Sequence, residues 1–305
     1  MMMNQIALIR RELWEHRSLY VSPLVLGAVL VLVQVTGQVA VSGFGPHIDM
    51  ALLGATNIGI NERAAVISAL MAVYAVLFVL VMFITTTFYS LDSLYAERKD
   101  KSILFWRSMP VTDAETVVSK LLTALVVIPV ITLACIAVTH LIVLIVTSIW
   151  VGARGANAWH LIWDAVPLLD NWGATLIIVL ATAMWLAPFV GWFLLISAFT
   201  KRSPMMMATL PLIVLPLLER SILETQLLGH AIFVRTVQIP IYKDVDIHGL
   251  FNEKLLTIAN DAGISLLSML DIGRFAGSPG LWGGFIVCGL FTTAAIYVRR
   301  FRDDS

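Results

Sequence analysis

The chain has few charged residues and few cysteines, and both shortages narrow what it can be. Only 13% of its 305 residues are charged, against about a quarter in a soluble domain. The net charge of zero points to no particular partner, and we expect no nucleic acid to bind. Cys135 and Cys288 lie in separate apolar runs, which excludes a disulfide framework and a thiolate metal site.

Two catalytic signatures are also missing from the sequence. No segment matches the phosphate-binding motif GxxxxGK[ST], so the chain cannot bind and hydrolyse ATP by that route. The HExxH motif is absent, no two carboxylates share an expected span, and one intramembrane histidine cannot hold a metal ion. We therefore expect no catalytic residue, no metal and no cofactor in this chain, and an intramembrane enzyme is disfavoured.

Apolar residues make up most of the chain. The hydrophobic share of 59% and the mean hydropathy of +0.89 indicate an all-α polytopic membrane protein. A bilayer core about 30 Å thick is crossed by about 20 apolar residues in a helix. We expect a single membrane domain over residues 1–305 with six transmembrane helices. They cover residues 21–41, 64–89, 121–149, 173–199, 204–218 and 281–298.

The helix ends and the flanking segments carry further signals. Ser203 precedes Pro204 and Ser278 precedes Pro279, and each pair places an N-cap before a proline in the first helical position. Residues 1–20 have apolar side chains such as Ile6 on one helical face, which predicts an interfacial helix in contact with membrane lipids. The alternative is a charged start that only orients the first span.

Lysine and arginine decide the expected orientation, because basic residues resist translocation. With a cytoplasmic N-terminus, most of them gather on one side, including Arg10, Arg98, Arg107 and Arg299. We therefore expect both termini in the cytoplasm and a multi-pass protein of the cytoplasmic (inner) membrane of a bacterium.

Residues 90–120 form the main polar interruption between the second and third spans. Leu94 and Tyr95 continue the helical spacing of the second span, so this helix should protrude from the membrane. A short amphipathic helix over 102–109 should follow and end at Pro110, because proline breaks a helix. Thr112 and Glu115 have the spacing of a capping box that starts the next helix.

This segment, with its Glu97-Arg98 pair, short helix, Pro110-Val111 turn and Lys120 opening the next span, resembles the corresponding loop of ABC-2 type transporter permeases. In that family the loop carries a coupling helix that docks on a separate ATPase subunit. The resemblance implies two ATPase copies, which bind ATP and Mg, and a second permease chain, for which we expect a homodimer. The implied ATPase-coupling residues are Glu97, Arg98, Lys101, Ile103, Phe105, Trp106, Arg107 and Pro110. The alternative is a solvated connector whose charges only enforce topology.

Polar residues inside the spans and helix-bending prolines are candidates for a transport pathway or an interface. They are Gln34, Gln38, Thr86, His140, Pro211, Pro216, Glu219 and Arg220. A lone histidine is, alternatively, a packing or hydrogen-bonding group. The two prolines predict a bent fifth span that faces protein, or alternatively a tilted helix that ends normally at Leu218.

The outer segment, residues 219–280, is expected to be partly helical, and Gly280 and Gly284 after it have the GxxxG spacing of close helix contacts. Few charges line the expected path, which favours export of an amphipathic or hydrophobic cargo. The sequence is also compatible with a membrane anchor or sensor subunit that does not transport.

Overall fold

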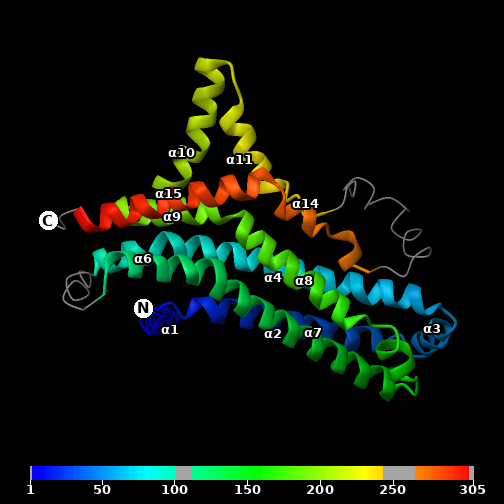
Figure 1. Cartoon of the computed structure of the whole chain (residues 1–305). Coiled ribbons are helices and arrows are strands. Elements are labelled where there is room, and N and C mark those ends of the chain that lie inside the picture. The colour runs from blue at the N-terminus through cyan, green and yellow to red at the C-terminus, as the bar shows by residue number, and fades with distance from the viewer. Residues whose placement is uncertain (1, 101–110, 243–264, 302–305) are drawn as a thin grey trace.

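The computed structural model describes residues 2–100, 111–242 and 265–301, and this part of the chain is almost entirely helical (Figure 1). One isolated antiparallel bridge joins Tyr242 to Leu270. Six helices are long and apolar enough to cross a membrane, which confirms the expected fold class. They are Ser18–Ser42, Ile60–Lys99, Asp113–Ala153, Leu168–Trp185, Pro204–Leu223 and Pro279–Phe301.

The N-terminal helix α1 (Met2–Glu15) ends five residues before the expected boundary, and α2 (Ser18–Ser42) follows it. Its inward face differs from the expected one. Leu8 and Glu12 are buried, whereas Ile6 is 67% exposed. The reason is electrostatic, because Glu12 has a buried lysine as its partner. A further helix, α3 (Pro46–Thr56), lies between the first two spans and was not expected.

Helix α4 (Ile60–Lys99) has 40 residues. At 1.5 Å per residue it is about 60 Å long, twice the thickness of a bilayer core. The second span therefore continues beyond the membrane, as the spacing of Leu94 and Tyr95 predicts. The third span begins with α6 (Asp113–Leu122), where the capping box of Thr112 and Glu115 is present as predicted.

The third span has a local irregularity. A π-helical turn, η1 (Thr123–Val127), joins α6 to α7 (Ile128–Ala153). Pro129 has no amide hydrogen to donate to the preceding turn, which accounts for a change of helical winding at this place.

The fourth span is not one helix, so the prediction of a single helix over 173–199 is wrong. Helix α8 (Leu168–Trp185) is followed by Leu186, which lies outside both helices, and α9 (Ala187–Phe199) begins directly after it. Pro188 lies in the first turn of α9 and lacks an amide hydrogen for the carbonyl four residues earlier. The apolar run continues through this break, which is why hydropathy does not reveal it.

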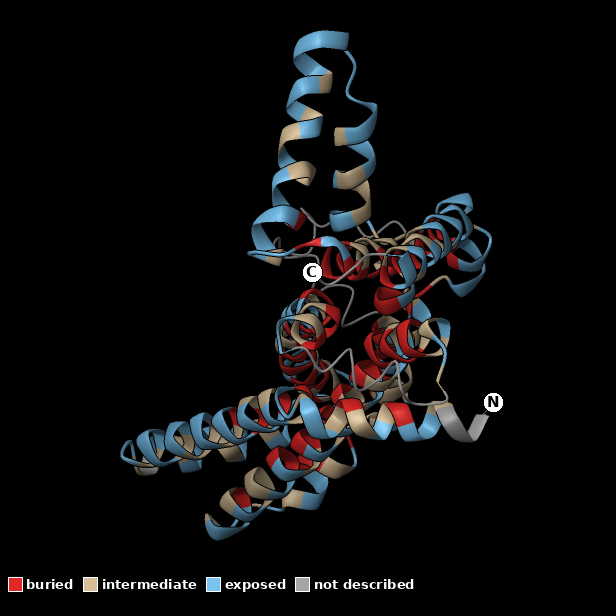
Figure 2. Cartoon of the chain, turned by 90° about the vertical axis from the view of Figure 1, so that its left-hand side faces the viewer, coloured by how far each residue is buried: buried red, intermediate tan, exposed pale blue. Residues whose placement is uncertain are grey.

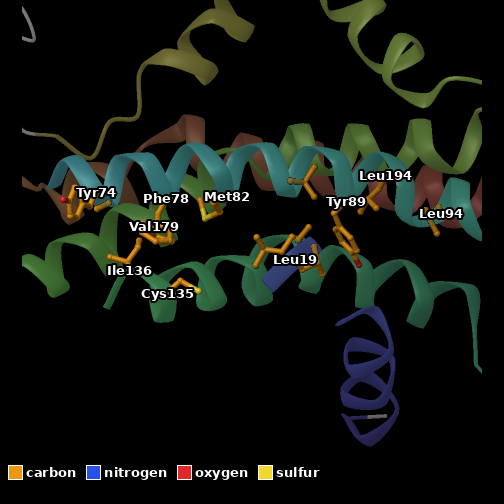
Figure 3. Close-up of a cluster of buried hydrophobic side chains, with 14 of the residues drawn as sticks. Leu19, Tyr74, Phe78, Met82, Tyr89, Leu94, Cys135, Ile136, Val179 and Leu194 are labelled. Carbon is orange, nitrogen blue, oxygen red and sulfur yellow. The ribbon is translucent and has the colours of Figure 1, made fainter. Parts of the chain in front are cut away.

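The core lies where α2, α4, α7 and α9 meet, and the side chains of Leu19, Phe78, Ile136 and Leu194 fill it (Figure 3). Helix α9 packs closely on the last span, α15 (Pro279–Phe301). A Cβ atom on Gly191 of α9 would lie 3.0 Å from the carbonyl oxygen of Cys288 on α15. A side chain at this position would require the backbone of α15 to move by a few tenths of an ångström, so glycine favours the close approach of the two helices.

Helix α10 (Pro204–Leu218), the π-helical turn η3 (Glu219–Leu223) and α11 (Leu227–Val237) form a hairpin that projects from the bundle (Figures 1 and 2). Pro204 starts α10 as predicted, but Ser203 does not cap it and has a left-handed backbone with φ of 30°. Helix α10 stays continuous through Pro211 and Pro216. Within the single chain one side of α10 packs on α9 and α4 through Ala208 and Leu212, and Ala208 is its one buried residue.

The remaining outer elements are short. They are η2 (Trp159–Trp163), η4 (Leu267–Met269) and α14 (Ile272–Ala276). At the start of α15, the hydroxyl of Ser278 accepts a hydrogen bond from the Leu281 amide at 3.3 Å, so the predicted cap is confirmed. Residues 243–264 of the expected outer segment lie outside the described residues.

Candidate functional site

Six charged side chains meet at the end of the bundle that holds both chain termini (Figure 1). They come from α1, α4, α6 and α15, and we call them the ion cluster. Its members are Arg11, Glu12, Glu97, Asp113, Lys120 and Arg299. The cluster joins the two helices that flank residues 101–110 to the first and last helices of the chain.

Glu97, near the end of α4, is the centre of the cluster. One carboxylate oxygen lies 2.6 Å from Nη1 of Arg299, and the other lies 3.1 Å from both Nζ of Lys120 and Nη2 of Arg11. The Glu97 side chain is 4% exposed. One carboxylate therefore connects three helices through three cations.

Lys120 of α6 also binds Glu12 of α1. Its Nζ atom lies 2.8 Å from Oε1 of Glu12, and both side chains are at most 1% exposed. The Tyr89 hydroxyl donates to the other oxygen of Glu12 at 2.8 Å. In Figure 3, Tyr89 lies on α4 at the edge of the apolar core, so the ion cluster and the core are continuous.

The outer rim of the cluster is less buried. Arg299 Nε lies 2.9 Å from Asp113, whose side chain is 27% exposed, and Arg11 Nε lies 2.7 Å from Glu15. Burial alone would lower the pKa of Arg11, but the hydrogen bond that Arg11 donates to Glu15 and the charge of Glu97 outweigh it and raise the pKa above its usual value.

Burial makes this arrangement sensitive to the loss of any member. Removing water from an ion costs several kcal/mol, which only well-placed opposite charges offset. Removing one partner of such a pair typically costs about 3–5 kcal/mol. Among the described residues, no group of three histidines, cysteines or carboxylates is placed to hold a metal ion, so the carboxylates serve as partners for cations of the chain itself.

Arg98 fixes the end of α4 in a second way. Its Nη2 atom donates to the carbonyl oxygens of Ser197 and, at 2.8 Å, Thr200 at the end of α9. The Ser197 hydroxyl accepts from the amides of Leu94 and Tyr95. A cation at the carbonyl end of a helix is stabilising. The end of α4 is therefore attached to α9 as well as to α1, α6 and α15.

The predicted ATPase-coupling residues fall into two groups. Glu97 and Arg98 have intramolecular partners. The others lie outside the described residues: Lys101, Ile103, Phe105, Trp106, Arg107 and Pro110.

A polar hollow of about 400 Å³ opens beside the cluster, between the start of α6 and the end of α15. Thr112, Asp113, Arg299 and Arg300 line it. Two members of the ion cluster, Asp113 and Arg299, form part of its wall.

Two of the predicted pathway residues meet in the structure. Gln34 and Gln38 of α2 both donate to the Thr147 hydroxyl of α7, at 3.2 and 2.9 Å, and the Tyr74 hydroxyl donates to Gln34 at 3.0 Å. They form a polar contact between three helices. Thr86 lies apart from them, beside a small cavity near η1 and the Leu186 break.

His140 is a packed side chain, 1% exposed, whose Nε2 lies 3.1 Å from the carbonyl oxygen of Met71.

At the tip of the projecting hairpin, Glu219 accepts hydrogen bonds from the amides of Leu227 and Leu228 at 2.7 and 2.9 Å, while Arg220 is exposed. The structure does not bring these residues together with His140 or Gln34.

Sequence reasoning missed the buried roles of Glu12, Asp113 and Arg299. One signal was present, because the acidic residues Glu12, Glu97 and Asp113 lie close to basic residues near the ends of apolar segments. Helical spacing could not pair them, since Glu97 and Arg299 are 202 residues apart in the sequence.

Part of the chain resembles a known protein family. Residues 63–156, which cover most of α4 and all of α6 and α7, match the family model described as ABC-2 family transporter protein. No match was found among curated proteins or among solved structures. The matched region holds Glu97, Asp113 and Lys120 of the ion cluster.

Proposed function

We propose that the chain is a permease powered by a separate ATPase subunit, since residues 63–156 match the model of the ABC-2 transporter family and six helices are long and apolar enough to cross a membrane. ATP and Mg would bind in that subunit, because the chain has no phosphate-binding motif. The alternative, an anchor or sensor without transport, shares the spans but has no need for a buried connection between them.

The observation that carries the proposal is the ion cluster. Residues 101–110 lie between α4 and α6, and Glu97 and Lys120 connect these two helices to α1 and α15. A force applied to the 101–110 segment would therefore reach four helices at once. Glu97 and Arg98 act in this proposal as positioning residues that hold the segment, and the ATPase binds the segment itself.

The same geometry supports an orientation. Helix α1 and the end of α15 lie at the same end of the bundle as the flanks of 101–110 (Figure 1). This end carries Arg10, Arg11, Arg299 and Arg300, and basic residues favour the cytoplasmic side. Both termini then lie in the cytoplasm, and the protein lies in the inner membrane of a bacterium.

A second identical chain is the proposed partner of α10, the first helix of the projecting hairpin. Only 6% of the most apolar stretch of Pro204–Leu223 is buried, and apolar side chains cover it on all sides. Pro211 and Pro216 leave backbone carbonyls without donors, which a lipid cannot satisfy but a protein surface can. Two permease chains and two ATPase chains make up the proposed complex.

The proposed cargo is amphipathic or hydrophobic. An apolar groove of about 630 Å³ lies between α2 and α7, with Pro23, Gly27, Ala134 and Cys135 among its lining residues. Such a surface suits an acyl chain or a drug-like molecule better than a bare ion.

The test is purification of the tagged chain from its native membranes in mild detergent. We expect a copurified ATPase, MgATP hydrolysis, and a mass for two permease and two ATPase chains. A variant in which residues 102–107 are replaced by Gly and Ser should lose the ATPase. Retention of the ATPase in this variant, or its absence from the wild-type preparation, would overturn the proposal and favour the anchor or sensor.

A further inference from the structure

The glycine pair at the start of the last span accommodates an arginine. A Cβ atom on Gly284 would lie 1.3 Å from Nη2 of Arg235, which belongs to α11. A Cβ atom on Gly280 would lie 2.9 Å from the ring of Trp185 and 3.6 Å from Nη1 of Arg235. The GxxxG spacing thus forms a notch for a guanidinium group, and not a contact between two helix backbones.

The contacts of Arg235 leave its charge incompletely balanced. Nη1 donates to the carbonyl oxygen of Gly280 at 2.5 Å, and the guanidinium carbon lies 4.2 Å from the ring centroid of Trp185. Within the described ranges, no carboxylate forms an ion pair with Arg235. A buried or half-buried cation normally has an anionic partner, so one is missing here.

Two hydrogen-bond donors at this place lack acceptors. Nη2 of Arg235 and Nε1 of Trp185 are both buried without a hydrogen-bond partner, and Trp185 is only 4% exposed. Unpartnered buried donors are rare in proteins. The surroundings of Arg235 and Trp185 therefore offer more hydrogen-bond donors than acceptors, and an anion could accept hydrogen bonds from these donors.

The depth of Arg235 in the membrane narrows the choice of anion. Gly284 lies 15 residues before Arg299 on α15, about 22 Å at 1.5 Å per residue. With Arg299 at the cytoplasmic edge, Arg235 lies near the outer edge of a core about 30 Å thick. Arg235 is half-buried and Gly280 beside it is exposed, so an outer-leaflet headgroup can approach the edge of the guanidinium and must enter the notch to reach the buried Nη2 atom.

We propose that Arg235, held by Trp185 and the Gly280–Gly284 notch, binds the anionic phosphate of an amphipathic lipid at the outer side of the membrane. A guanidinium offers paired donors that match phosphate oxygens. The exposed Phe233 and Val237 on the same helix provide an apolar surface for the acyl chains. The inference rests on the membrane orientation proposed above but not on the ATPase.

The test is binding of short-chain phosphatidylglycerol to the purified chain in detergent, without any ATPase. Arg235→Gln should weaken binding at least tenfold. Arg235→Lys keeps the charge but loses the paired donors, and should give a smaller loss. Phosphatidylcholine and inorganic phosphate should bind at least tenfold more weakly than phosphatidylglycerol to the wild-type chain.

A matched pair of glycine variants separates recognition from misfolding. Gly284→Ala displaces Arg235, whereas Gly283→Ala adds a methyl group where no atom lies within 4 Å. We expect weaker lipid binding for Gly284→Ala alone, and unchanged binding for Gly283→Ala and for Arg220→Gln at the hairpin tip. Wild-type affinity in both Arg235→Gln and Gly284→Ala would overturn the proposal, and so would equal binding of inorganic phosphate.

Discussion

Replacement of Lys120 by methionine removes one charge from the most buried part of the ion cluster. The Lys120 side chain is fully buried and lies 2.8 Å from Glu12 and 3.1 Å from Glu97. Methionine keeps an unbranched apolar stem, so packing changes little. The effect on stability should therefore report the charge alone.

Glu12 and Glu97 both lose the charge of Lys120 in this variant, but they keep different partners. Glu97 keeps Arg11 and Arg299 as partners, whereas Glu12 keeps the Tyr89 hydroxyl at 2.8 Å and His16 at 3.9 Å. The cost of Lys120→Met should thus come mainly from Glu12, and we expect the free energy of unfolding to fall by about 3–5 kcal/mol. Adding Glu12→Gln removes the stranded charge and should recover about 1–3 kcal/mol.

The assay is reversible unfolding in mixed micelles with increasing dodecyl sulfate, for the wild type, both single variants and the double variant. Asp92→Asn is the matched control, because Asp92 is an exposed carboxylate on the same end of α4, and it should change stability by less than about 0.5 kcal/mol. A Lys120→Met variant as stable as this control, or strictly additive effects in the double variant, would refute the reasoning.

Two further changes test the helix ends and the helix packing. Thr112→Ala removes the acceptor of the Glu115 amide hydrogen bond, 3.2 Å long, and should cost about 1 kcal/mol, seen as faster hydrogen exchange in the first turn of α6. Unchanged exchange would contradict a capping role. Gly191→Val places atoms against the Cys288 carbonyl and should cost about 1–3 kcal/mol, with faster thiol labelling of Cys288. At Gly37 an added Cβ meets no atom within 4 Å, so Gly37→Val should leave labelling unchanged, and equal labelling in both variants would contradict the close packing.

Local signals in the sequence predicted local structure well. The capping box at Thr112, the helix starts at Pro204 and Pro279, and the protruding second span all appear in the structure. Each depends on a few neighbouring residues and on hydropathy. The break at Leu186 has a local signal, Pro188, but a proline within an apolar run does not by itself say whether the span stays continuous.

Long-range features were not predictable from one sequence. Glu12 lies in the helix that was predicted to be interfacial, but it is buried because it forms an ion pair with Lys120, 108 residues later in the sequence. The role of the glycine pair depends on Arg235, which approaches from another helix 45 residues earlier than Gly280. Such pairs carry no periodicity, so only the fold brings them together.

In the proposed mechanism, ATP-driven motion passes through the ion cluster. The most direct test measures the distance between two spin labels, one at Trp14→Cys on α1 and one at Tyr297→Cys on α15, which are both exposed positions. Cys135 and Cys288 are replaced by alanine so that only these two positions are labelled. In the complex with its ATPase, trapping with MgATP and vanadate should shift this distance in the otherwise unchanged chain and in Asp92→Asn. Glu97→Gln should hydrolyse MgATP without the shift. A shift of the same size in Glu97→Gln would contradict the account.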